Sequence, residues 1–208
     1  MTATMIVWVV AGAVAAYLCG SISSAVLVCR FAGLPDPRGE GSGNPGATNV
    51  LRIGGKGPAL ATLAGDFLKG WLPVAVAGML DAPASVLAAA MVCAFAGHLY
   101  PVFFGFKGGK GVATALGAIT GLSLWLGLAA AASGLLAAAV TRISSASSLV
   151  TAMAVPVYTW FLTRDWLLVG ATLLLAALQF WRHRGNIHNL LSGQEPRIGA
   201  SRRNQPRA

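Results

Sequence analysis

Two short stretches combine glycine with polar and basic side chains, and both lie between long apolar runs. Residues 41–52 read GSGNPGATNVLR, and residues 107–111 read KGGKG. Glycine lets backbone N–H groups approach an anion closely, and arginine or lysine supplies the opposite charge. These residue types indicate phosphate binding at a membrane surface.

The candidate ligands of the first stretch are backbone groups, hydroxyls and amides, and one guanidinium suited to bidentate phosphate contact: Gly41, Ser42, Gly43, Asn44, Thr48, Asn49 and Arg52. We treat the whole stretch as a loop that Arg52 closes. The second stretch contributes Lys107, Gly108, Gly109, Lys110 and Gly111, with Thr114 following. Simple polar turns are the alternative reading of both stretches.

The first stretch also matches a dinucleotide-binding pattern, but its surroundings exclude that function. Gly41, Gly43 and Gly46 fit G-x-G-x-x-G, and Asp66 follows at roughly the expected 20 residues. The preceding residues 35–40, PDPRGE, cannot form the buried strand that this fingerprint requires. Residues 107–111 are not a Walker A loop either, because glycine follows Lys110 where serine or threonine is needed.

The rest of the chain predicts an all-α membrane protein with a single domain, residues 1–208, and a basic tail, residues 182–208. The sequence is 56% hydrophobic and 10% charged over 208 residues. Its apolar runs are residues 5–29, 58–80, 82–106, 111–141, 143–163 and 166–181. The first run exceeds the roughly 20 residues that span a bilayer. No basic residue precedes it, so we do not expect a signal peptide.

Run 111–141 is long enough for one tilted helix or for two short helices that fold back near residues 126–128. Charge favours two, since about seven spans then place every basic residue except Arg164 on one side. That side is cytoplasmic by the positive-inside rule, so the N-terminus lies outside and the tail lies in the cytoplasm. We therefore expect a multi-pass protein of the bacterial inner membrane, whose active site faces the cytoplasm.

The net charge of +9 has an explanation that does not involve nucleic acid. Positive-inside topology and anionic lipid headgroups account for it, so the expected partners include membrane lipids. Cys19, Cys29 and Cys93 have no metal-ligand spacing, and we expect no metal site and no cofactor. Gly117 and Gly121 are suited to close helix packing.

Ionisable residues inside or beside the apolar runs are further candidates. Asp66 and Lys69 are three residues apart and face one side of a helix, where they either contact substrate or neutralise each other. His98 ends an apolar run and is either an acid–base group or a hydrogen-bonded interfacial residue. In the tail, Arg182, His183 and Asn186 directly follow the last run, so they can fold over the cytoplasmic face.

Taken in order, three polar clusters resemble the bacterial acyl-phosphate:glycerol-3-phosphate acyltransferases, the membrane-integral Y-type family. The first cluster is residues 41–49 with Arg52. The second runs from Gly97 and His98 through Pro101 to residues 106–114, and the third is residues 182–184 with residues 186–187. The resemblance covers nearly the whole chain.

This resemblance implies that an acyl-phosphate donates its acyl group to the 1-hydroxyl of sn-glycerol 3-phosphate, the first acylation of phospholipid synthesis. The products are lysophosphatidic acid and phosphate. Two phosphates must then be held. We expect Ser42, Arg52 and one of Lys107 and Lys110 to hold glycerol phosphate, with glycine N–H groups covering the acyl-phosphate.

The catalytic residues expected are Ser42, Lys107, Lys110, His183 and Asn186. An acyl-phosphate is already activated, and its own phosphate oxygen can accept the hydroxyl proton. In this scheme His183 and Asn186 orient glycerol phosphate or stabilise the oxyanion, and a lysine offsets the charge of the leaving phosphate. Arg182, His183, Asn186, Asp66, Lys69 and His98 are also expected to contact substrate.

Two alternatives stay open at this stage. Ser42 acting as a covalent nucleophile is the rival within the enzyme class. A transporter of phosphate or glycerol phosphate is the rival of another class, although no inverted repeat is visible. The sequence leaves open the acyl chain length, the oligomeric state and which lysine meets which phosphate.

Overall fold

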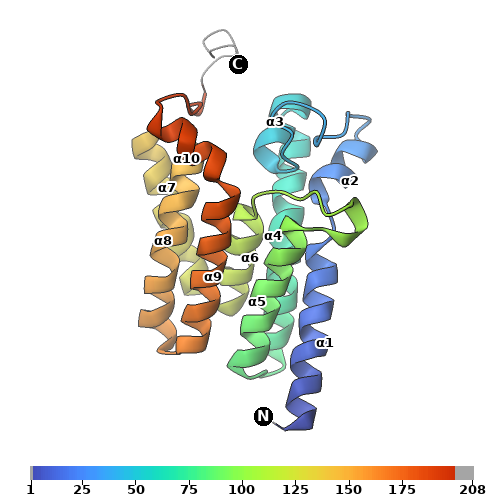
Figure 1. The fold of residues 1–208 in the computed structure, drawn as a ribbon, viewed down its shortest axis with the longest axis vertical. Helices are drawn as coiled ribbons and strands as arrows, with labels where there is room; N and C mark the ends of the chain where they lie inside the picture. Colours follow the sequence, from blue (N-terminus) through green and yellow to red (C-terminus); the bar gives the residue numbers. More distant parts are fainter. Residues whose placement is uncertain (1, 200–208) are drawn as a thin grey trace.

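The computed structural model describes residues 2–199, and within this range every regular element is a helix (Figure 1). This confirms the all-α fold class. In chain order the helices are α1 (Ala3–Gly20), α2 (Ser24–Phe31), α3 (Ala47–Gly54), α4 (Lys56–Met79), α5 (Ala84–Leu99), the short η1 (Val102–Phe104), α6 (Val112–Leu122), α7 (Leu124–Thr141), α8 (Ser144–Thr163), α9 (Trp166–Arg182) and α10 (Arg184–Leu191).

Five helical segments of the described chain are long and apolar enough to cross a membrane. They are Ala3–Phe31, Lys56–Met79, Ala84–Phe104, Leu124–Thr141 and Ser144–Thr163. Two further apolar helices, α6 and α9, are shorter. The predicted basic tail lies partly outside the described residues, because the description ends at residue 199.

The first apolar run is not one helix, contrary to the expectation for residues 5–29. A break at residues 21–23 separates α1 from α2. A break leaves backbone carbonyls without helical partners, and the carbonyl of Ile22 instead accepts a 2.7 Å hydrogen bond from Lys69 Nζ in α4. The break between α1 and α2 therefore lies where the buried Lys69 ammonium contacts the backbone.

Run 111–141 forms two helices, α6 and α7, as charge had favoured. The break lies at Ser123 rather than at residues 126–128. Ser123 has extended backbone, φ −159°, and its hydroxyl accepts a 3.4 Å hydrogen bond from the Leu126 N–H, so it caps α7. Gly127 lies inside α7, where a side chain would overlap Thr120. The expected break position was wrong because the cap, not the Leu126 to Leu128 region, starts the helix.

Run 82–106 is helical only to Leu99. A residue before proline is disfavoured in the α conformation, and Tyr100, which precedes Pro101, has φ −134° and ψ 67°. The chain then makes the short η1 turn and continues without regular structure to Gly111. As a result the second glycine-rich stretch is a loop that starts from the end of α5.

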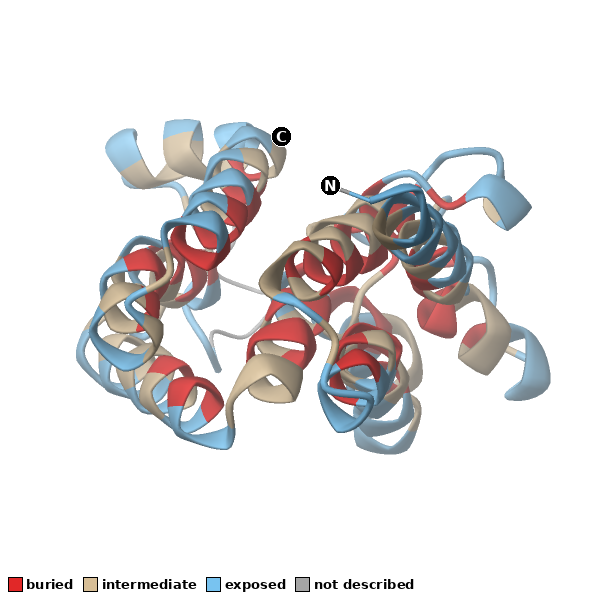
Figure 2. Cartoon of the chain, turned by 90° about the horizontal axis from the view of Figure 1, so that it is seen from below, coloured by how far each residue is buried: buried red, intermediate tan, exposed pale blue. Residues whose placement is uncertain are grey.

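Glycines bring the helices of the bundle into backbone contact. A Cβ at Gly117 would overlap the carbonyl of Phe67 in α4, and one at Gly121 would lie 2.8 Å from the Trp71 carbonyl. The expected packing role of these two glycines is thereby confirmed. Gly20 likewise lies against the backbone of Ala94, which joins α1 to α5. Figure 2 shows the buried residues on the facing sides of the helices, with exposed residues outward.

The polar segments gather at one end of the bundle, opposite the start of α1 (Figure 1). This end contains α2, α3, the second glycine-rich loop and α10. The α4–α5 and α8–α9 turns lie at the other end. The fold thus brings the three polar clusters of the sequence to the same end.

Candidate active site

The first glycine-rich stretch is a loop only up to Gly46, because residues 47–54 form α3. Thr48, Asn49 and Arg52 therefore belong to a helix, which corrects the expectation of one continuous loop. Ser42, Thr48 and Arg52 are exposed on this surface. Asn49 is 1% exposed.

The Asn49 amide holds the loop in shape. Its Nδ2 donates 2.9 Å hydrogen bonds to the carbonyls of Pro37 and Glu40, and its Oδ1 accepts one from the Ser42 N–H. A Cβ at Gly41, which has φ 63°, would overlap the same amide oxygen. Because the amide is fully used by the backbone, Asn49 shapes the loop instead of contacting substrate, contrary to the expectation.

The second loop is held by hydrogen bonds to the His98 carbonyl and from the Arg182 guanidinium. The Gly109 N–H donates a 3.3 Å hydrogen bond to the His98 carbonyl. The Arg182 guanidinium donates to the carbonyls of Gly108, at 2.6 Å, and Gly109, at 3.0 Å. Both glycines are buried. The Gly109 N–H is therefore not available to an acyl-phosphate, which corrects that part of the expectation.

Lys110 and the tail are joined by a chain of polar contacts. Lys110 Nζ donates to Asn186 Oδ1, and Asn186 Nδ2 donates a 2.6 Å hydrogen bond to Glu195. Glu195 also accepts a 2.6 Å hydrogen bond from the Ser145 hydroxyl of α8. The second loop and the third polar cluster thus form one connected site, as the sequence had predicted.

Lys110 is half-buried and surrounded by other cations. Burial lowers the pKa of Lys110, and the charges of Arg52 and Arg182 lower it further, whereas Glu195 raises it. The nearby charges place Arg52 of the first cluster in the same electrostatic environment as Lys110. A bound phosphate would stabilise the protonated form of Lys110, because its negative charge attracts the ammonium group.

His183 is 2% exposed, and both of its ring nitrogens have partners. Nδ1 lies 2.8 Å from the Gln179 carbonyl, and Nε2 lies 3.2 Å from the Ser148 hydroxyl. Burial lowers the pKa of His183, so the ring is neutral at pH 7. Since a carbonyl only accepts, Nδ1 carries the proton. Nε2 then competes with the Ser145 carbonyl, 2.9 Å away from the Ser148 hydroxyl, for the single proton of that hydroxyl. In this geometry His183 joins α8 to α9 and has no free nitrogen for a substrate.

Four of the expected ligands lie inside the helix bundle instead of on the loops: Asp66, Lys69, His98 and Thr114. All four are buried, with exposed fractions of 3%, 5%, 6% and 0%. Lys69 Nζ lies 2.8 Å from Asp66 Oδ1, so the ion-pair alternative for these two residues is the one observed. The structure therefore places these four expected ligands inside the helix bundle and not on the exposed surface of the loops.

The remaining expected ligands differ in accessibility. Lys107 is exposed on the second loop, and Asn44 is half-buried in the first. Gly43 and Gly111 have positive φ, 68° and 82°, and Gly111 directly precedes α6. Arg38 connects the two loops, because its guanidinium is paired with Asp36 at 2.6 Å and donates to the Phe104 carbonyl at 3.0 Å.

Four further residues of this site were not among the expected ligands: Ser145, Ser148, Gln179 and Glu195. Gln179 donates a 2.9 Å hydrogen bond to the Ser148 carbonyl, so it holds α9 against α8 below His183. One signal was available, since Gln179 is the single amide in the apolar run 166–181. The serines at positions 144, 145, 147 and 148 were a second signal, because they cluster at the start of a span.

An apolar cavity of about 330 Å³ opens between α6, α7, α8 and α9. Its lining includes Val112, directly after the second loop, and Ser148 and Gln179, which contact His183. Deeper in the bundle the cavity is lined by Ile119, Ala131 and other apolar side chains. The cavity therefore begins beside the polar site and continues among the helices.

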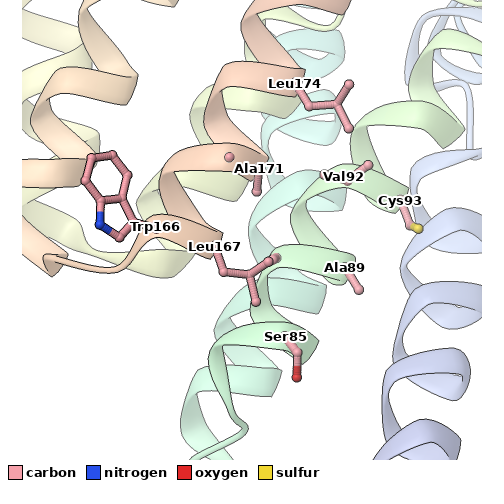
Figure 3. A pocket seen from close by; sticks show the side chains of 10 residues that line it. Ser85, Ala89, Val92, Cys93, Trp166, Leu167, Ala171 and Leu174 are labelled. Carbon is pink, nitrogen blue, oxygen red and sulfur yellow. The ribbon is translucent and has the colours of Figure 1, made fainter. Parts of the chain in front are cut away.

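A second apolar groove, of about 400 Å³, lies between α5 and α9 on another face (Figure 3). Ser85, Ala89 and Cys93 of α5 and Leu167, Ala171 and Leu174 of α9 line it. None of the loop or tail residues described above lines this groove, so it is separate from the polar site. Within residues 2–199, no three His, Cys, Asp or Glu side chains are grouped to hold a metal ion.

These helices and basic loops define a membrane-embedded helical protein whose basic and polar loop residues gather at one end of its bundle. The chain belongs to the glycerol-3-phosphate acyltransferase family, whose profile matches residues 10–193. A glycerol-3-phosphate acyltransferase of Thioalkalivibrio sulfidiphilus is 58% identical over 190 residues, which cover 91% of this chain and 94% of the relative. One of Methylococcus capsulatus is 54% identical over 187 residues, 90% of this chain and 94% of the relative.

Solved structures show the same fold. A crystal structure of PlsY (YgiH), an integral membrane glycerol 3-phosphate acyltransferase in its glycerol 3-phosphate form, matches with a TM-score of 0.87 and 35% identity, covering 92% of this chain and 96% of that chain. The lysophosphatidic acid form matches with a TM-score of 0.85 and 34% identity, covering 92% and 95%.

Proposed function

We propose that this protein transfers a fatty acyl group from an acyl-phosphate to the 1-hydroxyl of sn-glycerol 3-phosphate. The products are lysophosphatidic acid and inorganic phosphate. The observation that carries the proposal is the connection of Lys110 to Asn186, and of Gly108 and Gly109 to Arg182, at the mouth of an apolar cavity. Cations beside an apolar cavity suit a substrate with a phosphate and a hydrocarbon chain. The family membership and the titles of the solved relatives support this choice.

The two phosphates have separate places in this proposal. Glycerol phosphate binds between Ser42 and Arg52 of the first cluster and Lys107 of the second loop, all of which are exposed. The acyl-phosphate lies at the start of α6, where the first N–H groups of the helix have no intrahelical partners and the helix dipole favours an anion. Lys110 lies two residues before this helix and offsets the negative charge of the leaving phosphate. The acyl chain enters the cavity that begins at Val112.

The transfer is direct and assisted by the substrate. The glycerol hydroxyl oxygen attacks the acyl carbonyl carbon, the bond from that carbon to the phosphate oxygen breaks, and the hydroxyl proton passes to the departing phosphate. Asn186 holds Lys110 in place, and His183 fixes α8 and α9 around the site. Among the described residues, the Ser42 hydroxyl has no hydrogen bond to a histidine or carboxylate that would make it a nucleophile. The scheme uses no cofactor.

For the membrane topology, we propose seven spans, with α6 and α9 as the two short ones and the α1–α2 segment as one. The N-terminus is then outside, and the site faces the cytoplasm of a bacterial inner membrane. The exposed basic residues of the loops support this orientation by the positive-inside rule. Cysteine substitutions in the α4–α5 turn and in α10, labelled from either side of the membrane, test it, and labelling of both from the same side would contradict it.

Purified protein in detergent micelles tests the activity itself. Acyl-phosphate and glycerol 3-phosphate together should give lysophosphatidic acid and phosphate in equal amounts, although micelles contain no compartments. Absence of product in micelles, together with uptake of labelled glycerol 3-phosphate into proteoliposomes, would indicate a transporter. Activity with a thioester donor alone would remove the acyl-phosphate assignment. Isolation of an acyl-serine at Ser42 after incubation with acyl-phosphate alone would replace direct transfer with a covalent intermediate.

A further inference from the structure

Asp66, Lys69 and His98 form a buried polar cluster where α4, α5 and the break after α1 meet. Lys69 Nζ lies 2.8 Å from Asp66 Oδ1 and donates a 2.7 Å hydrogen bond to the Ile22 carbonyl. His98 Nδ1 lies 3.6 Å from the same Asp66 oxygen. Ionisable groups inside a membrane protein are costly and are retained for a role. All three side chains are buried, so a supporting role fits them better than one on the exposed surface of the loops.

His98 lies directly beneath the second glycine-rich loop. Its carbonyl accepts the Gly109 N–H at 3.3 Å. A Cβ at Gly108 would overlap the His98 carbonyl oxygen, and a Cβ at Gly109 would overlap His98 Nε2. The backbone carbonyl and the ring of His98 therefore both contact the second loop and limit how closely the loop approaches α5. The opposite edge of the ring, Nδ1, faces Asp66.

In this arrangement the ring of His98 lies between the Asp66 carboxylate and the second glycine-rich loop. Among the described residues Nδ1 has no hydrogen-bond partner, so the Asp66 carboxylate, 3.6 Å away, acts on the ring through its charge. The other edge of the ring, Nε2, lies where a Cβ of Gly109 would be. Since the loop has no free space above His98, a rotated ring displaces the loop and the Lys110 that follows it. Displacements of about 1 Å at a catalytic group can cost on the order of 100-fold in rate.

We infer that Asp66 is a positioning residue, which acts through His98 to set the second loop for acyl transfer, while Lys69 neutralises the Asp66 carboxylate. The inference rests on the proposed activity, and the wild-type assay reports on that activity separately. If wild-type protein forms no lysophosphatidic acid, the proposed function fails. If wild-type protein is active and the variants below behave otherwise than stated, only the positioning role fails.

A plain ion pair and a positioning residue make different predictions for an apolar replacement of the pair. Removing one partner of a buried pair destabilises a protein, whereas replacing both with apolar residues often restores stability. We expect Asp66→Asn to lower the thermal midpoint and the double variant Asp66→Leu/Lys69→Met to recover it. In the double variant kcat should stay at least tenfold below wild type, because His98 still lacks its carboxylate. Leu68→Ala, an exposed site on the same helix, is the matched control.

Hydrogen exchange reports on the loop directly. In the double variant, the peptide covering residues 104–112 should exchange faster than in the wild type and the Leu68→Ala control, because the Gly109 N–H is no longer held on the His98 carbonyl. Recovery of kcat together with the thermal midpoint, with unchanged exchange, would overturn the positioning role. It would leave Asp66 and Lys69 as a structural ion pair.

A double-mutant cycle tests whether Asp66 acts through His98. Asp66→Asn should lower kcat in the wild-type background and have less than a twofold further effect in a His98→Gln background, since residues that act through one another are not additive. An equal decrease in both backgrounds would show that Asp66 acts by another route. The KM for glycerol 3-phosphate should change less than kcat in both cases, because two of its three proposed ligands, Ser42 and Arg52, belong to the first cluster and not to the second loop.

Discussion

Replacing Arg182 by lysine separates the charge of this residue from its geometry. The guanidinium donates to two neighbouring carbonyls, those of Gly108 and Gly109, at 2.6 and 3.0 Å. A lysine ammonium keeps the charge but is a point donor on a flexible stem, and it cannot reproduce a planar fork. Arg182→Lys should therefore loosen the second loop without removing positive charge from the site.

The expected size of the effect follows from the two hydrogen bonds. A hydrogen bond from a charged donor contributes about 1.5–3 kcal/mol when it is well formed. Arg182 is half-buried, and lysine can retain one of the two bonds, so the loss is about 2 kcal/mol. This corresponds to roughly a 30-fold decrease in kcat/KM, at about 1.4 kcal/mol per tenfold. Arg182→Gln, which also removes the charge, should lose more.

Initial rates of lysophosphatidic acid formation, measured at varied concentrations of each substrate, give kcat/KM for the variants. Arg184→Lys is the control, since the neighbouring arginine is exposed and lies over the Trp181 ring instead of the loop. It should remain within about twofold of wild type, as surface substitutions usually do. If Arg182→Lys is as active as Arg184→Lys while Arg182→Gln is not, charge alone matters and the positional argument is refuted.

Three further predictions concern pH, packing and chain length. The pKa of Lys110 is lowered, and only its protonated form binds phosphate, so kcat/KM should begin to fall at a pH below the pKa of an ordinary lysine. Lys110→Arg should move this alkaline decrease in kcat/KM to higher pH. An unchanged decrease in the variant would exclude Lys110 as its source. Gly117→Leu should lower the thermal midpoint strongly, because α4 and α6 are in backbone contact there; Gly78→Leu, where a Cβ meets nothing, should not, and equal effects would contradict this packing. Ala131→Phe should raise the KM for long-chain acyl-phosphates more than for short-chain ones, because the larger side chain narrows the deep part of the cavity. Leu128→Phe, at an exposed position, is the control. The same increase in KM in the control would show that the cavity does not hold the acyl chain.

Much of the fold could be predicted from the sequence, because apolar runs in a membrane have few alternatives to helices. The positions of the breaks were less predictable. A hydrogen bond to Ser123 starts α7, and the steric restriction that Pro101 places on Tyr100 ends α5 early. Local interactions thus moved both boundaries away from the edges of the apolar runs. The break between α1 and α2 depends on contacts from α4 that no local pattern contains.

The candidate site was predicted in part, by the kinds of residue present and not by their contacts. The glycines, Lys110, Arg182 and Asn186 were recognised from their types and spacing, and the structure joins them. Glu195 was missed as the partner of Asn186, nine residues before it. Ser145, which also donates to Glu195, was missed because it lies 50 residues away in the chain. Asn49 was assigned to substrate, yet its amide is used by the loop backbone.

By itself the sequence determined that this chain is a helical membrane protein, and it predicted phosphate-binding residues in three polar clusters. Apolar runs and glycine-rich basic stretches carry that information in the residue types. The tertiary structure alone decided which polar residues are surface ligands and which are supports. Asp66, Lys69 and His98 look like substrate ligands in the sequence, but burial beneath the second loop leaves them to one another. The physical reason is that burial and hydrogen-bond partners arise from helices distant in the chain, and these decide what a charged side chain can reach.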